Sequence, residues 1–166
     1  FNSQYTSEFY DENGEVIYPP VNSEYTFEEG DLSKIVYFAR FSEEKNMEEA
    51  IEISEKSGSS LNLMGFKDSK SYLKTLKEIS GEKVNFLPNA SGEQVESALR
   101  NCGIGINTSN DYEGFGITTI EYMKSGCITV VKDSAANSET VEMEDLKYNT
   151  VEEAVEIIKK LRASDD

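Results

Sequence analysis

The chain has 166 residues, 37% of them hydrophobic, and a mean hydropathy of −0.53, which fits one soluble globular domain with a sizeable core. Its 32 acidic residues outnumber 16 basic ones, and the net charge of −16 disfavours general nucleic-acid binding, since phosphate backbones require a basic surface. The absence of His excludes a His-based catalytic triad and the common zinc sites within this chain. No apolar run approaches the ~18–20 residues of a membrane span.

The first 30 residues lack the regular pattern of the rest. The chain does not begin with Met and shows no secretory signal, so we expect a fragment or an excised domain of a longer protein. Residues 1–10 are expected to end a helix, and residues 16–21 to form a strand that runs into a stiff turn at Pro19 and Pro20. Residues 22–31 read as a surface loop.

After residue 30, apolar runs of strand length alternate with amphipathic stretches of helical period. Polar residues that can cap a helix precede several of these stretches: Asn46 with Glu49, Asp68, the capping box Ser91 with Gln94, and the capping box Thr150 with Glu153. We expect strands at residues 34–40, 60–65, 84–87, 103–107 and 127–131, and helices at residues 46–57 and 116–125 and after Asp68, Ser91 and Thr150.

This alternation predicts an α/β fold: a Rossmann-like parallel sheet with helices on both faces. Nearly continuous apolar strands support it, because such strands are buried on both sides. Ligands of these sheets bind beyond the carboxyl ends of the strands, where Arg40 and residues 108–115 are expected to lie. Cys102 and Cys127 are expected to be reduced and partly buried, since two thiols do not make a disulfide framework.

Arg40 and Lys45 are candidates for a diphosphate site. Arg40, one of three arginines in the sequence, is expected to end a strand, and Lys45 to open the next helix. A guanidinium and an ammonium beside a helix N-terminus can donate several charge-assisted hydrogen bonds to phosphate. Taken alone, the pair is more typical of ordinary exposed charges than of a phosphate site.

The stretch from Glu113 to Glu121 is the strongest functional signal. Two glutamates flank seven residues, and Gly114 and Gly116 permit close approach of the backbone to a ligand. Glu121 can accept two hydrogen bonds from vicinal ribose hydroxyls, while Glu113 would lie beside a sugar and a diphosphate. The alternative, on these residues alone, is an acid that stabilises the helix dipole and an exposed helical Glu.

Residues 113–126 resemble the E-x7-E signature of retaining GT-B glycosyltransferases, specifically glycosyltransferase family 4. The resemblance continues in other segments, including the Arg40 to Asn46 stretch, which is similar to the family's strand-Arg-to-Lys-Asn element. The family's strand-then-helix segment resembles residues 84–91, and its hinge strand resembles residues 17–21. The end of its first domain resembles residues 2–6.

The resemblance implies a domain division and residue roles. Residues 1–22 would be the end of a preceding domain with the hinge, and residues 23–166 the nucleotide-sugar donor domain, one half of a GT-B fold. Arg40 and Lys45 would bind the donor diphosphate together with Gly114, Phe115 and Gly116; Glu113 would be catalytic and face the transferred sugar; Glu121 would hold the ribose.

The resemblance also implies partners. The donor would be a GDP- or UDP-sugar, and the Tyr18-Pro19-Pro20 hinge is similar to that of mannosyltransferases that use GDP-mannose. No metal or other cofactor is expected to be required. The full-length enzyme would be a cytoplasmic hexosyltransferase, open to a lipid acceptor and membrane association, whereas this fragment would be inactive without its acceptor domain. Residues 122–129 depart from the family pattern and lack its proline, but these positions lie behind the ligand.

Two alternatives remain. The same fold could serve as a non-catalytic nucleotide-binding or protein-interaction module that uses its acidic face. A nucleotide-sugar epimerase of similar architecture is disfavoured by the layout of the carboxylates.

Overall fold

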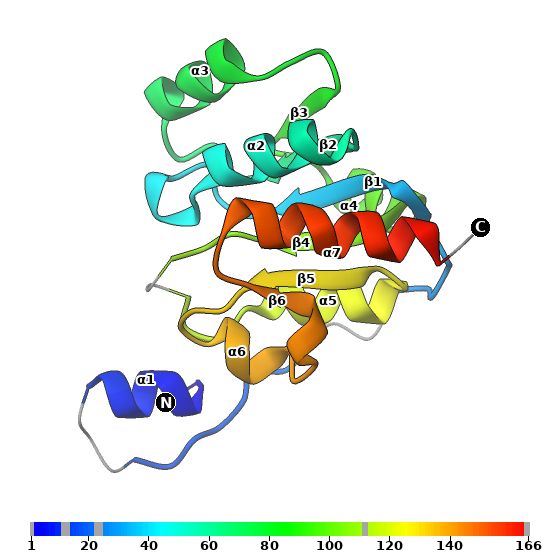
Figure 1. Ribbon diagram of the computed structural model, residues 1–166. Helices are drawn as coiled ribbons and strands as arrows, with labels where there is room; N and C mark the ends of the chain where they lie inside the picture. Colours follow the sequence, from blue (N-terminus) through cyan, green and yellow to red (C-terminus); the bar gives the residue numbers. More distant parts are fainter. Residues whose placement is uncertain (1, 11–13, 22–24, 111–112, 165–166) are drawn as a thin grey trace.

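The computed structural model describes residues 2–10, 14–21, 25–110 and 113–164. Within them a six-stranded, fully parallel sheet lies between two layers of helices (Figure 1), so the predicted Rossmann-like α/β fold is confirmed. The strand order is β3-β2-β1-β4-β5-β6. The strands are β1 (Asp31–Phe38), β2 (Ser60–Gly65), β3 (Val84–Pro88), β4 (Cys102–Asn107), β5 (Ile128–Lys132) and β6 (Lys147–Tyr148).

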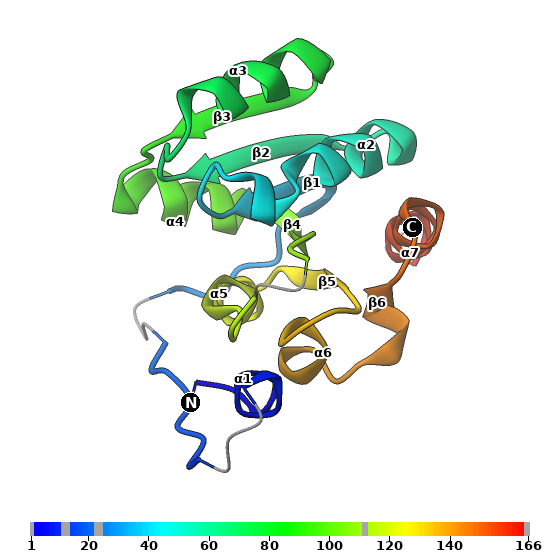
Figure 2. The ribbon, with the colours of Figure 1, turned by 90° about the vertical axis from the view of Figure 1, so that its left-hand side faces the viewer.

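The helices divide between the two faces of the sheet (Figure 2). One face carries α2 (Met47–Ser57), α3 (Lys70–Ile79) and α7 (Val151–Ala163), and the other carries α4 (Gly92–Asn101) and α5 (Ile117–Ser125). The short helices α1 (Gln4–Phe9) and α6 (Asn137–Thr140) lie side by side beyond the sheet, and the 3-10 turns are η1 (Glu43–Lys45) and η2 (Glu144–Leu146).

Alternation along the strands builds a core on each face. In β1, Ile35 and Tyr37 belong to the cluster under α2 and α7, whereas Val36 belongs to the cluster under α4 and α5. All three side chains are fully buried, as a central strand covered on both sides requires. Cys102 and Cys127 are free, as expected, and are buried more completely than expected. Burial raises their pKa values to about 11 and about 12.

Of the four predicted helix caps, two are confirmed, Asn46 is at the N-cap position without a side-chain capping hydrogen bond, and Asp68 is wrong. The capping boxes that start at Ser91 and Thr150 are confirmed. Asn46 is in the left-handed region at φ 48°, and its side chain donates to the Glu49 carboxylate (2.8 Å) instead of accepting a backbone N–H. Asp68 does not cap α3, because the Ser69 hydroxyl takes that position.

The N-terminal segment contains the predicted helix but not the predicted strand. A helix is present as α1, with a capping box between Ser3 and Thr6, but the strand predicted over residues 16–21 is wrong. Pro19 and Pro20 cannot donate to a ladder, and the described part of this stretch is extended without strand pairing. The predicted loop over residues 22–31 includes residues 22–24, which lie outside the described residues, and Asp31 already begins β1.

Gly105 offers a direct test of this packing. A Cβ added there would lie 2.4 Å from the ring of Tyr122, a fully buried side chain. We expect Gly105→Ala to lower the free energy of unfolding by about 1–3 kcal/mol through overpacking, measured by urea denaturation. Gly92→Ala is the matched control: a Cβ there meets nothing within 4 Å, so stability should be unchanged or slightly higher. Equal stability of the two variants would contradict this packing.

Candidate functional site

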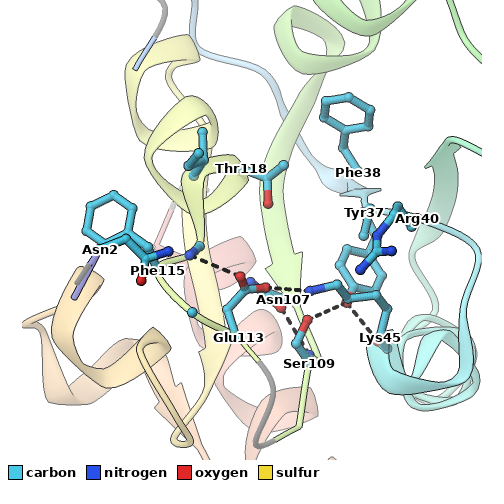
Figure 3. A pocket seen from close by; sticks show the side chains of 14 residues that line it. Asn2, Tyr37, Phe38, Arg40, Lys45, Asn107, Ser109, Glu113, Phe115 and Thr118 are labelled. Atoms are coloured by element: carbon cyan, nitrogen blue, oxygen red, sulfur yellow. Dashed lines mark hydrogen bonds and ion pairs between the residues drawn. The ribbon is translucent and has the colours of Figure 1, made fainter. Parts of the chain in front are cut away.

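A pocket of about 270 Å³ opens where the strand order reverses. The chain moves outward from β1 to β2 and β3 and then returns to β4, beside β1. The carboxyl ends of these two neighbouring strands therefore diverge into different loops, which is where parallel sheets bind ligands. The pocket is lined by residues that follow β1, residues that follow β4, the start of α5, and Asn2 (Figure 3).

An ion pair crosses this pocket. Lys45 Nζ, from the β1 side, lies 2.9 Å from Glu113 Oε2, from the β4 side, and the two side chains are only 13% and 15% exposed. The other oxygen, Glu113 Oε1, accepts a hydrogen bond from the Gly116 N–H (3.1 Å). Glu113 therefore holds both the lysine and the glycine at which α5 begins. Gly116 has φ 78°, a conformation that favours glycine.

Buried hydroxyl groups fix the backbone of Lys45. Its carbonyl accepts hydrogen bonds from the Tyr37 hydroxyl (2.7 Å) and from Thr108 Oγ1 (3.0 Å), and Thr108 also donates to the Asn46 carbonyl (2.8 Å). Desolvation raises the pKa of Tyr37, so it remains a neutral donor. Tyr37 in β1 and Thr108 just after β4 thus fix the backbone from which the Lys45 side chain enters the pocket.

Arg40 lies at the rim of the same pocket. It follows the end of β1 by two residues, so the expectation that it ends the strand is off by that distance. Its side chain is 57% exposed and pairs with Glu44 (2.6 Å) and, at 3.8 Å, with Asp68. Lys45 closes η1 and α2 begins at Met47, so Lys45 precedes the helix that it was expected to open.

The loop of residues 113–116 lines the pocket throughout. Gly114 lies against Asn2: a Cβ at Gly114 would come within 3.2 Å of the Asn2 amide nitrogen. The Phe115 ring stands 5.3 Å from the Tyr18 ring, measured between centroids. Side chains from the N-terminal segment thus cover the outer side of this loop.

Glu121 is the one predicted site residue that does not line the pocket. It lies on α5 one turn beyond Ile117, which does line it, and its Oε1 accepts a hydrogen bond from the Tyr25 hydroxyl (3.1 Å). Burial raises the pKa of Glu121, an effect partly offset by this hydrogen bond and by the charge of Lys124. The structure therefore brings Arg40, Lys45, Glu113, Gly114, Phe115 and Gly116 together and places Glu121 just outside.

Several pocket residues escaped the sequence analysis. The most connected is Asn107, which donates to Thr119 Oγ1 (3.2 Å) and Asn137 Oδ1 (3.0 Å) and accepts from the Ser109 N–H (3.0 Å). The polar triplet at residues 107–109, directly after a buried strand, was the signal that could have revealed it. Other residues missed are Asn2, Tyr37, Phe38, Ala39, Ser109, Ile117 and Thr118.

The described residues contain no group of three potential metal ligands that could hold an ion. Among the described helices, none has the length and apolarity needed to cross a membrane.

The raised pKa of Glu121 yields a prediction. A carboxyl whose pKa is higher in the folded protein destabilises it when ionised, and the penalty fades as pH falls through the folded pKa. Glu121→Gln keeps an oxygen for Tyr25 but carries no charge, so we expect it to be more stable than the parent at pH 7.5, with the difference shrinking towards pH 4. Urea denaturation at both pH values measures this.

The control for that comparison is Glu156→Gln, which changes the charge equally at a side chain that is 64% exposed. It should show neither the gain nor its pH dependence. A Glu121→Gln variant that is less stable than the parent at pH 7.5 would contradict the electrostatic account.

Comparison with known proteins identifies the family and the fold. The family model of glycosyl transferases group 1 matches residues 22–165, while no curated protein matches the chain significantly in sequence. The crystal structure of TarM, an S. aureus protein, aligns with TM-score 0.76 and 19% identity over 98% of this chain and 35% of its own. Anabaena HepE in complex with UDP and glucose aligns with TM-score 0.76 and 22% identity over 96% of this chain and 52% of its own.

A third structure, the C-terminal domain of the group 1 family protein LpcC from Francisella tularensis, aligns with TM-score 0.70 and 17% identity, over 87% of this chain and 88% of its own. The chain thus spans about a third to a half of the longer structures and most of this single domain. The fold is that of one half of a GT-B glycosyltransferase. With a family model that matches most of its length, the chain belongs to the glycosyl transferases group 1 family.

Proposed function

We propose that residues 23–166 are the nucleotide-sugar donor domain of a retaining glycosyltransferase of family 4, and that residues 1–22 are the end of an acceptor-binding domain with its hinge. The observation that carries this proposal is the convergence of Arg40, Lys45 and Glu113 on one pocket at the point where the strand order reverses. Cations beside a carboxylate suit a ligand that joins a diphosphate to a sugar.

In this proposal Lys45 and Arg40 bind the diphosphate. Lys45 is held by its buried backbone contacts and can share its ammonium between Glu113 and a phosphate oxygen. Arg40 is exposed and can turn from Glu44 to the ligand. The N–H groups at the start of α5, after Gly114 and Gly116, add donors for a phosphate that enters the pocket.

Glu113 is the proposed catalytic carboxylate. Its position between the lysine and the start of α5 places a negative charge beside the sugar, where it can accept hydrogen bonds from hydroxyl groups and stabilise positive charge that develops at the anomeric carbon. No cofactor is required for these roles, because the two cations and the backbone N–H groups neutralise the leaving diphosphate.

Glu121 is the proposed ribose ligand. The nucleoside would run from the pocket along α5, past Ile117 and Thr118, to reach the carboxylate one turn further on. There the Glu121 carboxylate would accept hydrogen bonds from two vicinal ribose hydroxyls. These would replace, or add to, the hydrogen bond that it accepts from Tyr25. The cost of burying this charge is consistent with a residue retained for binding.

The proposed donor is a UDP- or GDP-sugar. The Anabaena structure with UDP and glucose supports UDP, and the Tyr18-Pro19-Pro20 hinge supports GDP-mannose. Transfer needs an acceptor held against the donor, so we infer that this chain binds the nucleotide but transfers little sugar by itself.

Nucleotide binding is the central test. We expect UDP or GDP at millimolar concentration to raise the melting temperature of the chain, because a ligand that binds the folded state stabilises it. Lys45→Gln and Arg40→Gln should each weaken binding about 10- to 150-fold, the range expected for a lost charge-assisted hydrogen bond, as measured by calorimetry. Lys159→Gln, at an exposed position on α7, should bind like the parent. No shift with either nucleotide would favour the protein-interaction module instead.

Glu44 gives a prediction of opposite sign. It holds Arg40 in an exposed ion pair and therefore competes with a diphosphate for the guanidinium. Exposed pairs contribute about 0.2–1 kcal/mol, so Glu44→Gln should tighten UDP or GDP binding by up to about 5-fold. Calorimetry measures this affinity, and Glu156→Gln is the control that separates the local effect from the change in net charge. Weaker binding by Glu44→Gln would contradict the prediction and mean that the ion pair orients Arg40 for the ligand.

A further inference from the structure

The N-terminal segment, which consists of residues 2–10 and 14–21, contacts consecutive residues of the loop 113–116, here called the donor loop after its proposed function. The buried Ser3 hydroxyl donates to the Gly114 carbonyl, and the Tyr18 ring packs on the Phe115 ring with centroids 5.3 Å apart. The loop that carries the proposed catalytic carboxylate is thus covered by residues more than 90 positions away in sequence.

Glu139 on α6 anchors the same segment. Its Oε1 accepts hydrogen bonds from the Gln4 N–H (3.0 Å) and the Tyr18 hydroxyl (2.7 Å), and its Oε2 accepts one from the Tyr5 N–H (3.2 Å). One carboxylate therefore joins the start of α1 to the extended stretch around Tyr18. The segment forms no strand pairing in the described structure, so it is held by contacts of this kind rather than by the sheet.

The turn that precedes Glu139 is hydrogen-bonded to the donor loop. The Ala136 N–H donates to the Glu113 carbonyl (3.2 Å), and the Glu139 N–H donates to the Ala136 carbonyl (3.2 Å). A short chain of contacts therefore runs from Tyr18 through Glu139 and α6 to the backbone of Glu113, whose side chain holds Lys45.

We propose that Tyr18 and Glu139, here called the clasp, are positioning residues that couple the placement of the N-terminal segment to the conformation of the donor loop and hence to nucleotide affinity. This inference rests on the proposed function and concerns how nucleotide binding at that same site is regulated. Gly114 and Gly116 leave the donor loop free to adopt other conformations, so contacts from outside the loop select the one in which Glu113 faces Lys45. When the segment moves with a neighbouring domain, the clasp transmits that movement to the pocket.

Coupling of this kind is reciprocal. If the docked segment favours nucleotide binding, the bound nucleotide must favour the docked segment by the same factor. This reciprocity provides a readout that a merely structural role for the clasp would not move: hydrogen exchange at the Gln4 and Tyr5 amides, whose N–H groups donate to Glu139.

The experiment combines two measurements on the 166-residue chain with UDP and GDP as probes. Tyr18→Phe removes the hydroxyl but keeps the ring on Phe115, and Glu139→Gln removes the charge at the centre of the clasp; Glu156→Gln is the matched control for charge. We expect each clasp variant to bind nucleotide about 5-fold or more weakly, the lower range of allosteric couplings, with Glu156→Gln unchanged. The double variant should lose less than the product of the two single effects, since both act on the same hydrogen bond: Tyr18→Phe removes its donor, and Glu139→Gln removes the charge on its acceptor.

Hydrogen exchange completes the test. In the parent chain, nucleotide should slow exchange in peptides that cover residues 4 and 5, and in Glu139→Gln this protection should be lost while the exchange of β1 stays the same. Parent-like affinity in both clasp variants, or nucleotide binding that leaves residues 4 and 5 unprotected, would overturn the coupling and leave the proposed function intact. If the parent chain binds neither nucleotide, the proposed function fails first and the inference fails with it.

Discussion

The ion pair between Lys45 and Glu113 is the interaction on which the site depends. It joins the loop after β1 to the loop after β4, and its low exposure means that both charges are largely removed from water. Such a pair gains little net stability, yet loss of one partner leaves a buried charge uncompensated. The remaining contacts of the pocket satisfy this constraint: Tyr37 and Thr108 hold the lysine backbone, while Gly116 donates to the glutamate.

Much of this arrangement could be predicted from sequence because it follows from local pattern and topology. Apolar runs marked the strands, and the carboxyl ends of parallel strands meet at one edge, so Arg40, Lys45 and Glu113 were expected together although Lys45 and Glu113 are 68 residues apart. The capping boxes at Ser91 and Thr150 were predictable for the same reason, since each is complete within four residues.

What escaped prediction depends on contacts that no local pattern encodes. Glu121 lies on a helix covered partly by the sheet and partly by the loop that carries Tyr25, and helical period alone could not show that this loop supplies a hydroxyl. The strand expected near Tyr18 failed because a strand needs a partner with free N–H and C=O groups, and this stretch instead docks through side chains to Glu139, 121 residues away. Asn46 was given a capping role from spacing, whereas its left-handed backbone turns its amide towards Glu49.

The proposed function requires a chain with net charge −16 to bind an anion. Around the pocket, among the residues that the structure describes, two cations face three carboxylates: Arg40 contacts Glu44 and Asp68, and Lys45 contacts Glu113. Long-range attraction would therefore not draw a diphosphate in, and in the proposed function binding is an exchange of carboxylate partners for phosphate oxygens. An exchange depends on geometry more than on total charge, because the ligand must offer better-placed oxygens than those already present. In the proposed function, the pocket discriminates against simple anions and favours a ligand whose hydroxyl groups reach Glu113 in the pocket and Glu121 just outside it, as those of a sugar joined to a nucleoside diphosphate would.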